Sequence, residues 1–158
     1  MPEAYDDEYA DILKRSWDDI PKPQLLPNGS WRLKVKNAKY MEPKAADQNP
    51  FVLFVYSPME PLADVDEDAI LELGDYDASQ NRLFFSIWLE TASDWDGLRN
   101  HIRKHGIDTG GRTPEDTLKA IKGTEVVAFL DRETYTPKGG GDTIERNTTA
   151  KFAPVDEA

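Results

Sequence analysis

Hydrophobic and polar residues alternate most regularly in the stretch 82–90, which reads RLFFSIWLE. Because successive residues of a β-strand point to opposite faces, this alternation predicts a strand with two different faces. One face is apolar and predicts a core contact; it carries Leu83, Phe85, Ile87 and Leu89. The other face combines a cation, a hydroxyl and two large rings, in Arg82, Phe84, Ser86 and Trp88. This combination suits stacking on flat, negatively charged partners, so the face is a candidate nucleic-acid platform.

Two further strands are predicted before this one. In the first, which follows the turn Asn28-Gly29, the apolar residues 31, 33 and 35 alternate with three cations, Arg32, Lys34 and Lys36. Neighbouring cations then stand about 7 Å apart, close to the phosphate spacing of an extended single strand. An edge strand protected by lysines is the alternative interpretation. The second strand, 51–56 (FVLFVY), is apolar on both faces, and a fully buried central strand is its plainer interpretation.

Apolar residues at helical spacing predict an amphipathic helix over residues 6–20, ended by Pro21. Its apolar positions are Tyr9, Ile12, Leu13, Trp17 and Ile20, with acids between them. This helix either packs on the main domain or docks on a partner. A second helix is predicted after Ser93, which we expect to cap it, and its inward face carries Trp95, Leu98 and Ile102.

The last two strands are predicted at 125–135 and 143–152, joined by a glycine-rich loop. The expected order is therefore three strands, a helix and two strands, which is the layout of the OB-fold, a five-stranded, partly open β-barrel. We expect a mainly β protein with this barrel, a helix between strands 3 and 4, and the N-terminal helix. A generic α+β sheet with a helix on one face is the competing interpretation.

The expected organisation has three parts. An N-terminal helix and Pro-rich connector occupy 1–25, an OB-fold domain with an acidic insertion at 57–81 occupies 26–155, and a short acidic tail occupies 156–158. A short helix is expected near 67–73 within the insertion.

The net charge of −11 over 158 residues argues against a nucleic-acid partner only if it is spread evenly, and it is not. Residues 1–20 carry seven acids and two bases, and residues 60–77 carry eight acids and no base. Residues 21–59 carry six bases and two acids. Because charges are screened over about 10 Å at about 0.1 M salt, a local basic groove can act despite distant acids.

The remaining composition indicates an ordinary cytoplasmic protein. The chain has no cysteine, which excludes disulfides and thiolate metal sites. No apolar run approaches the roughly 20 residues that span a bilayer, and the first residues lack the basic and apolar regions of a signal peptide. We expect no membrane association, and a location in the cytoplasm.

Five stretches carry a resemblance to bacteriophage single-stranded DNA-binding proteins of the OB-fold type. They are LPNGSWRLKV, RLFFSIWLE, HIRKHGID, KGTEVVAFLDRETY and NTTAKFAPV. The resemblance implies binding and protection of single-stranded DNA during replication or recombination, without strong sequence preference. It also implies replication or recombination proteins as partners and a location in the cytoplasm of the bacterial host cell, and a homo-oligomer is left open. Many such proteins end in a longer acidic tail, whereas only Asp156 and Glu157 follow the last strand here, so partner recruitment through the tail is in doubt.

The expected DNA-binding groove combines rings that stack on bases with cations that hold phosphates. Its floor is Phe84, Trp88 and Tyr56, and its phosphate contacts are Arg32, Lys34, Lys36 and Arg82, with Lys44 and Lys138 reaching in from two loops. We expect no catalytic residue, no metal site and no cofactor.

The sequence also raises four other hypotheses. Asp64, Asp66 and Asp68 resemble the start of a calcium loop, but Ala69 stands where such a loop needs glycine. The same three carboxylates are candidate ligands of a two-metal nuclease. His101 and His105 form half of a zinc pattern without a third ligand, so we expect solvated or core-edge side chains. The functional alternative to DNA binding is an acidic protein-interaction module, either a virion or assembly component or a DNA mimic.

Overall fold

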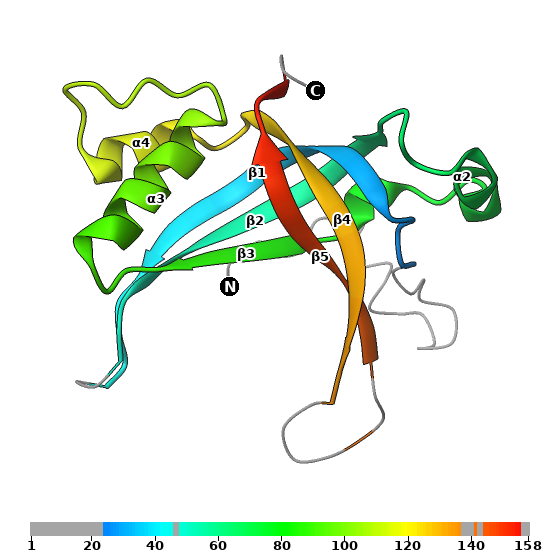
Figure 1. Ribbon diagram of the computed structural model, residues 1–158, viewed down its shortest axis with the longest axis horizontal. Coiled ribbons are helices and arrows are strands. Elements are labelled where there is room, and N and C mark those ends of the chain that lie inside the picture. The colour runs from blue at the N-terminus through cyan, green and yellow to red at the C-terminus, as the bar shows by residue number, and fades with distance from the viewer. Residues whose placement is uncertain (1–23, 46–47, 137–140, 142–143, 156–158) are drawn as a thin grey trace, which may run out of the picture.

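A computed structural model of the chain describes residues 24–45, 48–136, 141 and 144–155, and Figure 1 shows its ribbon. The described part is mainly β: five strands form one antiparallel sheet, and three α-helices and a short 3-10 helix accompany it. This confirms the predicted mainly β class and the predicted order of elements. The strands are β1 (Gly29–Met41), β2 (Phe51–Pro61), β3 (Leu83–Trp88), β4 (Glu125–Tyr135) and β5 (Ile144–Ala153).

The sheet has the strand order β3-β2-β1-β4-β5 and curls so that its two edges approach each other (Figure 1). The edge strands β3 and β5 are not hydrogen-bonded to each other over the described residues. They meet instead through side chains, since the rings of Phe85 and Phe152 lie 4.7 Å apart between centroids. The sheet is therefore barrel-like but not closed.

The inner face of the curled sheet forms the hydrophobic core. Alternate residues of the central strands point inward and are buried, as the period of two requires. They are Trp31, Leu33 and Val35 of β1, Val52, Phe54 and Tyr56 of β2, and Val126, Ala128 and Leu130 of β4. The indole N–H of Trp31 donates to the carbonyl oxygen of Pro27 (3.1 Å), so this buried ring leaves no unpaired donor.

Two helices stand at one end of the sheet, α3 (Ala92–Arg103) and α4 (Pro114–Ala120) (Figure 1). Helix α3 begins two residues earlier than predicted, because Thr91 and Asp94 form a reciprocal capping box and Ser93 does not act as the cap. Its buried residues are Leu98, His101 and Ile102. Trp95 lies along the same cleft as Leu98 and Ile102, as the predicted shared face requires, but it is not buried as predicted, since it is 41% exposed.

The acidic insertion lies at the opposite end and contains α2 (Glu67–Leu73) and the 3-10 helix η2 (Ala78–Gln80) (Figure 1). The short helix was predicted at these residues. The insertion is anchored to the start of β1: Asp64 accepts hydrogen bonds from the Ser30 backbone N–H (2.9 Å) and hydroxyl (2.8 Å). These bonds lower the pKa of Asp64. Next to Asp64, Val65 is buried in the core.

We expect Gly29→Ala to destabilise the protein by about 2–3 kcal/mol, because it affects both the backbone and the packing of the insertion. Gly29 has a φ of +134°, and an added Cβ would lie 2.6 Å from Cγ2 of Val65. Urea unfolding measures the loss. Gly74→Ala is the control, because Gly74 also has a positive φ (+58°) but no atom within 4 Å of the added Cβ. Equal losses in the two variants would show that the overlap with Val65 costs nothing.

Several predictions fall on residues that the structure does not describe. The N-terminal helix at 6–20, the tail at 156–158 and Lys138 all lie outside the described ranges. Among the residues that are described, none belongs to a helix long and apolar enough to cross a membrane.

Candidate nucleic-acid interface

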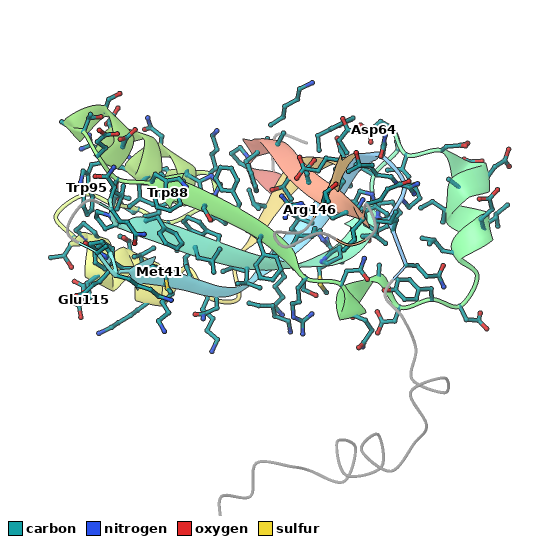
Figure 2. All side chains as sticks on the ribbon, turned by 90° about the horizontal axis from the view of Figure 1, so that it is seen from below. Met41, Asp64, Trp88, Trp95, Glu115 and Arg146 are labelled. Atoms are coloured by element: carbon teal, nitrogen blue, oxygen red, sulfur yellow. The ribbon has the colours of Figure 1, made fainter. Side chains whose placement is uncertain are left out.

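The outward-facing residues of β1, β2 and β3 form one continuous surface, which we call the outer strip. Cross-strand pairing arranges them in three rows, because directly paired residues share a face. The rows are Asn37–Val55–Phe84, Lys39–Leu53–Ser86 and Met41–Phe51–Trp88. Figure 2 shows Met41 and Trp88 toward the same end of the sheet, with Asp64 at the opposite end.

Two aromatic rings dominate the outer strip. Phe84 is 60% exposed and Trp88 is 55% exposed, as the alternation in the sequence predicted. The Trp88 ring contacts the ring of Phe51 on the neighbouring strand, with 4.5 Å between centroids. The indole is therefore supported from the side while more than half of its surface remains accessible. Two exposed rings four residues apart on one strand are separated by about 13 Å.

Tyr56 does not belong to this surface, and its predicted role in the groove floor is wrong. It pairs with Val35 and Leu83, which face the core, and its side chain is fully buried. Its hydroxyl lies 2.8 Å from Nε2 of His101 and 2.9 Å from Nε2 of His105. Burial raises the pKa of the Tyr56 hydroxyl, so this group stays protonated.

The two histidines are core residues, so the expectation of solvated or core-edge side chains is also wrong. His101 and His105 are both 5% exposed and form a hydrogen-bonded cluster with Tyr56. Burial lowers the pKa of His101 to about 3 and that of His105 to about 4. No group of three or more potential metal ligands occurs among the described residues.

Arg32 lies on β1, as predicted, but its charge is balanced within the protein. Its guanidinium forms ion pairs with Glu60 (Nη1 to Oε1, 3.1 Å) and Glu125 (Nε to Oε1, 3.4 Å), and the side chain is half-buried. A phosphate at this position would have to compete with two carboxylates. Arg32 is therefore a structural ion-pair residue, and its predicted phosphate contact has no support in this geometry.

The other described cations of the predicted groove lie around the outer strip, and most of them are exposed. Arg82 stands at the start of β3 on the side of Phe84, and its Nη1 donates to the carbonyl oxygens of Ser79 (2.9 Å) and Asn81 (3.1 Å). Lys34 is half-buried, whereas Lys36 is exposed, and Lys44 is exposed in the loop between β1 and β2. Within the described part of the chain, none of these three lysines forms an ion pair with a carboxylate.

Lys39 is the one cation among the nine residues of the outer strip, and simple alternation along the sequence does not predict it there. Simple alternation places Lys34 and Lys36 on one face and Lys39 on the other. The pairing register shifts between Val35 and Asn37, so Lys36 is the extra residue of a β-bulge and every later residue of β1 changes face. The Asn37-Ala38 sequence after the cations offers only a weak signal of this bulge.

Two acids of the insertion, Asp64 and Asp66, have structural roles. Asp64 binds Ser30, and Asp66 caps α2 by accepting from the Asp68 backbone N–H (3.3 Å). Their carboxylates are thus directed at backbone and hydroxyl donors of the protein itself. This arrangement gives no support to a calcium loop or to a two-metal nuclease site.

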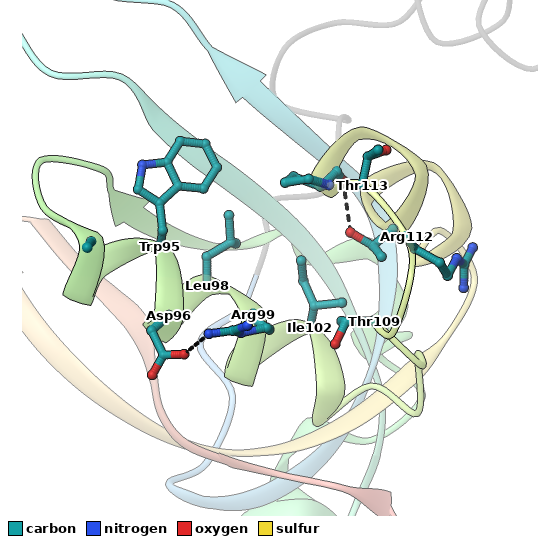
Figure 3. Close-up of a pocket in the computed structure, with 11 residues that line it drawn as sticks. Trp95, Asp96, Leu98, Arg99, Ile102, Thr109, Arg112 and Thr113 are labelled. Carbon is teal, nitrogen blue, oxygen red and sulfur yellow. Dashed lines mark hydrogen bonds and ion pairs between the residues drawn. The ribbon is translucent and has the colours of Figure 1, made fainter.

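A separate cleft of about 450 Å³ lies between α3 and α4, with Trp95, Leu98 and Ile102 along it (Figure 3). Its charged groups are partly paired already, because Arg99 forms an ion pair with Asp96 across one turn of α3. Among the residues that the structure describes, no histidine lines this cleft.

Comparison with known proteins does not assign the chain to a group: no protein-family model matches it, and no curated protein matches it.

Proposed function

We propose that the outer strip binds single-stranded DNA without strong sequence preference. The observation that carries this proposal is the exposure of Phe84 and Trp88 on one face, with Lys39 between their rows. Base–aromatic stacking is tolerant of sequence because every base has a flat face, and lysines neutralise the backbone between stacked bases. Duplex DNA keeps its bases stacked inside, so the rings have nothing to stack on.

The architecture supports the same proposal. We interpret the curled sheet as an open OB-fold, because the strand order and the helix between β3 and β4 are those of this barrel. OB-folds bind oligonucleotides across strands 2 and 3, where the outer strip has its two exposed rings, with help from the loop that contains Lys44. The resemblance to phage single-stranded DNA-binding proteins supports a role in replication or recombination.

The test is a fluorescence anisotropy titration with end-labelled oligothymidine longer than the roughly 4–16 nucleotides that one OB-fold covers. A duplex of equal length and an oligouridine are titrated in parallel. We expect binding of the single strands, weak binding of the duplex, and loss of affinity as salt is raised. Equal affinity for duplex and single strand, or no binding at low salt, would contradict the proposal.

We expect Lys39→Gln to reduce the dependence of binding on salt. If Lys39 neutralises one phosphate, the slope of log K against log salt becomes shallower by about 0.7. The matched control is Lys104→Gln, because Lys104 lines a hollow on the opposite, inward side of β3, together with Phe85 and Ile87. A slope that changes equally in the two variants would show a general charge effect and not a contact in the outer strip.

A protein-interaction module is the second candidate, and one observation favours it. The middle strand of the outer strip presents only apolar groups, from Phe51, Leu53 and Val55, which are half-buried and have no polar atom for a phosphate. An apolar surface of this kind also fits a protein partner. The anisotropy titration distinguishes the two candidates, because a protein-interaction surface leaves the labelled oligonucleotide free.

A further inference from the structure

The outer strip is an apolar surface that the described part of the chain leaves open. Six of its nine residues are apolar, and its two largest rings are each more than half exposed. Soluble proteins rarely leave such a contiguous surface without a partner. Whatever covers the outer strip in the absence of DNA therefore needs an apolar face. It also needs negative charge to lie beside Lys39 and Arg82.

The chain itself leads to this surface at its first described residues. Asn81 Nδ2 donates to the carbonyl oxygen of Gln24 (2.8 Å), and Leu26 is fully buried. Gln24 and Leu25 line the same hollow as Arg82, Phe84 and Ser86. The segment 1–23 thus joins the domain directly beside the first row of the outer strip.

The sequence of that segment has the required chemistry. Residues 1–20 carry seven acids against two bases, and five apolar residues recur at helical spacing within 6–20. A 15-residue helix is about 22 Å long, which exceeds the separation of about 13 Å between Phe84 and Trp88. The three residues 21–23 span at most about 10 Å, so they keep the segment near its point of attachment.

We propose that residues 6–20 lie across the outer strip of their own chain and compete with single-stranded DNA for it. The apolar side of the segment packs on Phe84, Leu53 and Trp88, and its acids face Lys39 and Arg82. The proposed contact between segment and outer strip is argued only from the chemistry of these two parts of the chain. The proposed competition with DNA also rests on the proposed function. Such autoinhibition covers the apolar surface of the free protein and so limits its nonspecific contacts. Single-stranded DNA that binds the outer strip would displace the segment.

The absence of cysteine from the chain allows a direct test of the contact. Ser86→Cys places a single thiol in the middle row of the outer strip, and Ser93→Cys places one on exposed α3. Each is combined with the segment variant Ile12→Ser/Leu13→Ser/Trp17→Ser, or with the polar-side control Ala10→Ser/Lys14→Ser/Asp18→Ser. The rate of maleimide labelling is then measured for the full chain.

We expect the thiol of Ser86→Cys to react about tenfold faster in the segment variant than in the parent and the polar-side control. The reason is that residues 6–20 then no longer cover the outer strip in most molecules. The thiol of Ser93→Cys should react at one rate throughout. Equal rates for Ser86→Cys in all backgrounds would overturn the contact. Protection that appears only as protein concentration rises would assign the surface to the segment of a second copy, and would overturn the intrachain contact.

The anisotropy titration then separates this inference from the proposed function. In the segment variant Ile12→Ser/Leu13→Ser/Trp17→Ser, we expect oligothymidine to bind about tenfold more tightly at low salt than in the parent. In the polar-side control we expect no change. Binding of equal strength in the parent and the segment variant would overturn the competition. If the thiol of Ser86→Cys is protected but neither the parent nor the segment variant binds the oligonucleotide, the contact between residues 6–20 and the outer strip is supported and the DNA-binding proposal fails.

Discussion

Trp88→Ala is expected to weaken the binding of single-stranded DNA by about one to two decades, because a stacked base contributes on the order of 1–3 kcal/mol. The fold should survive the substitution. More than half of the indole is already exposed, and its ring contact within the strip is with Phe51. Anisotropy titration with oligothymidine gives the affinity, and thermal unfolding monitors the fold.

Trp95→Ala is the matched control for this prediction. Trp95 is a second half-exposed indole, but it lies on α3 beside the cleft between α3 and α4 and not in the outer strip. We expect this variant to bind as the parent does. Trp88→Phe, which keeps a smaller ring at the same place, should fall between the parent and Trp88→Ala. If Trp95→Ala loses as much affinity as Trp88→Ala, the binding surface lies elsewhere.

Local patterns in the sequence were sufficient to predict most of the fold. The alternation in 82–90 predicted which residues of β3 face outward, since Arg82 and Ser86 give one face polar groups while the other face is entirely apolar. The short helix α2 was predicted at the residues where it occurs, and the structure shows that Asp66 supplies a standard N-cap before it. Such signals depend only on neighbouring residues, so they can be interpreted without knowledge of the tertiary contacts.

The site was harder to predict, because it depends on how strands pair. An apolar strand such as 51–56 offers no local signal of which face is inward, so Tyr56 was placed on the wrong side. A β-bulge of one residue places Lys39 in the outer strip and leaves Lys36 without a cross-strand partner on β2. The two carboxylates that balance Arg32 come from β2 and β4, far away in the sequence. Pairing register and long-range ion pairs are therefore the information that the sequence patterns lacked.

The buried cluster of Tyr56, His101 and His105 has one arrangement of protons that satisfies every bond. A carbonyl oxygen only accepts, so Nδ1 of His105 carries the proton that it donates to the His101 carbonyl (2.8 Å). Nε2 of neutral His105 then accepts from the Tyr56 hydroxyl, whose oxygen in turn accepts from Nε2–H of His101. Protonation of His105 would replace this acceptor with a donor and break the chain of hydrogen bonds.

This cluster should make the protein lose stability in mild acid. The two histidine pKa values are about 3 and about 4 in the folded protein, as burial disfavours the charged form, against 6.5 as the ordinary value. The unfolded chain therefore binds more protons below pH 6.5, and stability that is fully present above this pH falls as the pH falls. Each histidine contributes about 1.4 kcal/mol per pH unit, so we expect a loss of about 3–4 kcal/mol between pH 7.5 and pH 5.

Urea unfolding at several pH values measures this loss, and His101→Gln identifies its origin. The Nε2 amide of glutamine replaces the donor to Tyr56 but does not titrate, so the slope of stability against pH should be halved between pH 6.5 and pH 5. This window lies above the ordinary pKa range of carboxylates, which keeps Asp and Glu out of the measurement. An unchanged slope in His101→Gln, or histidine NMR signals that titrate near pH 6.5 in the folded protein, would show that the cluster does not exclude protons.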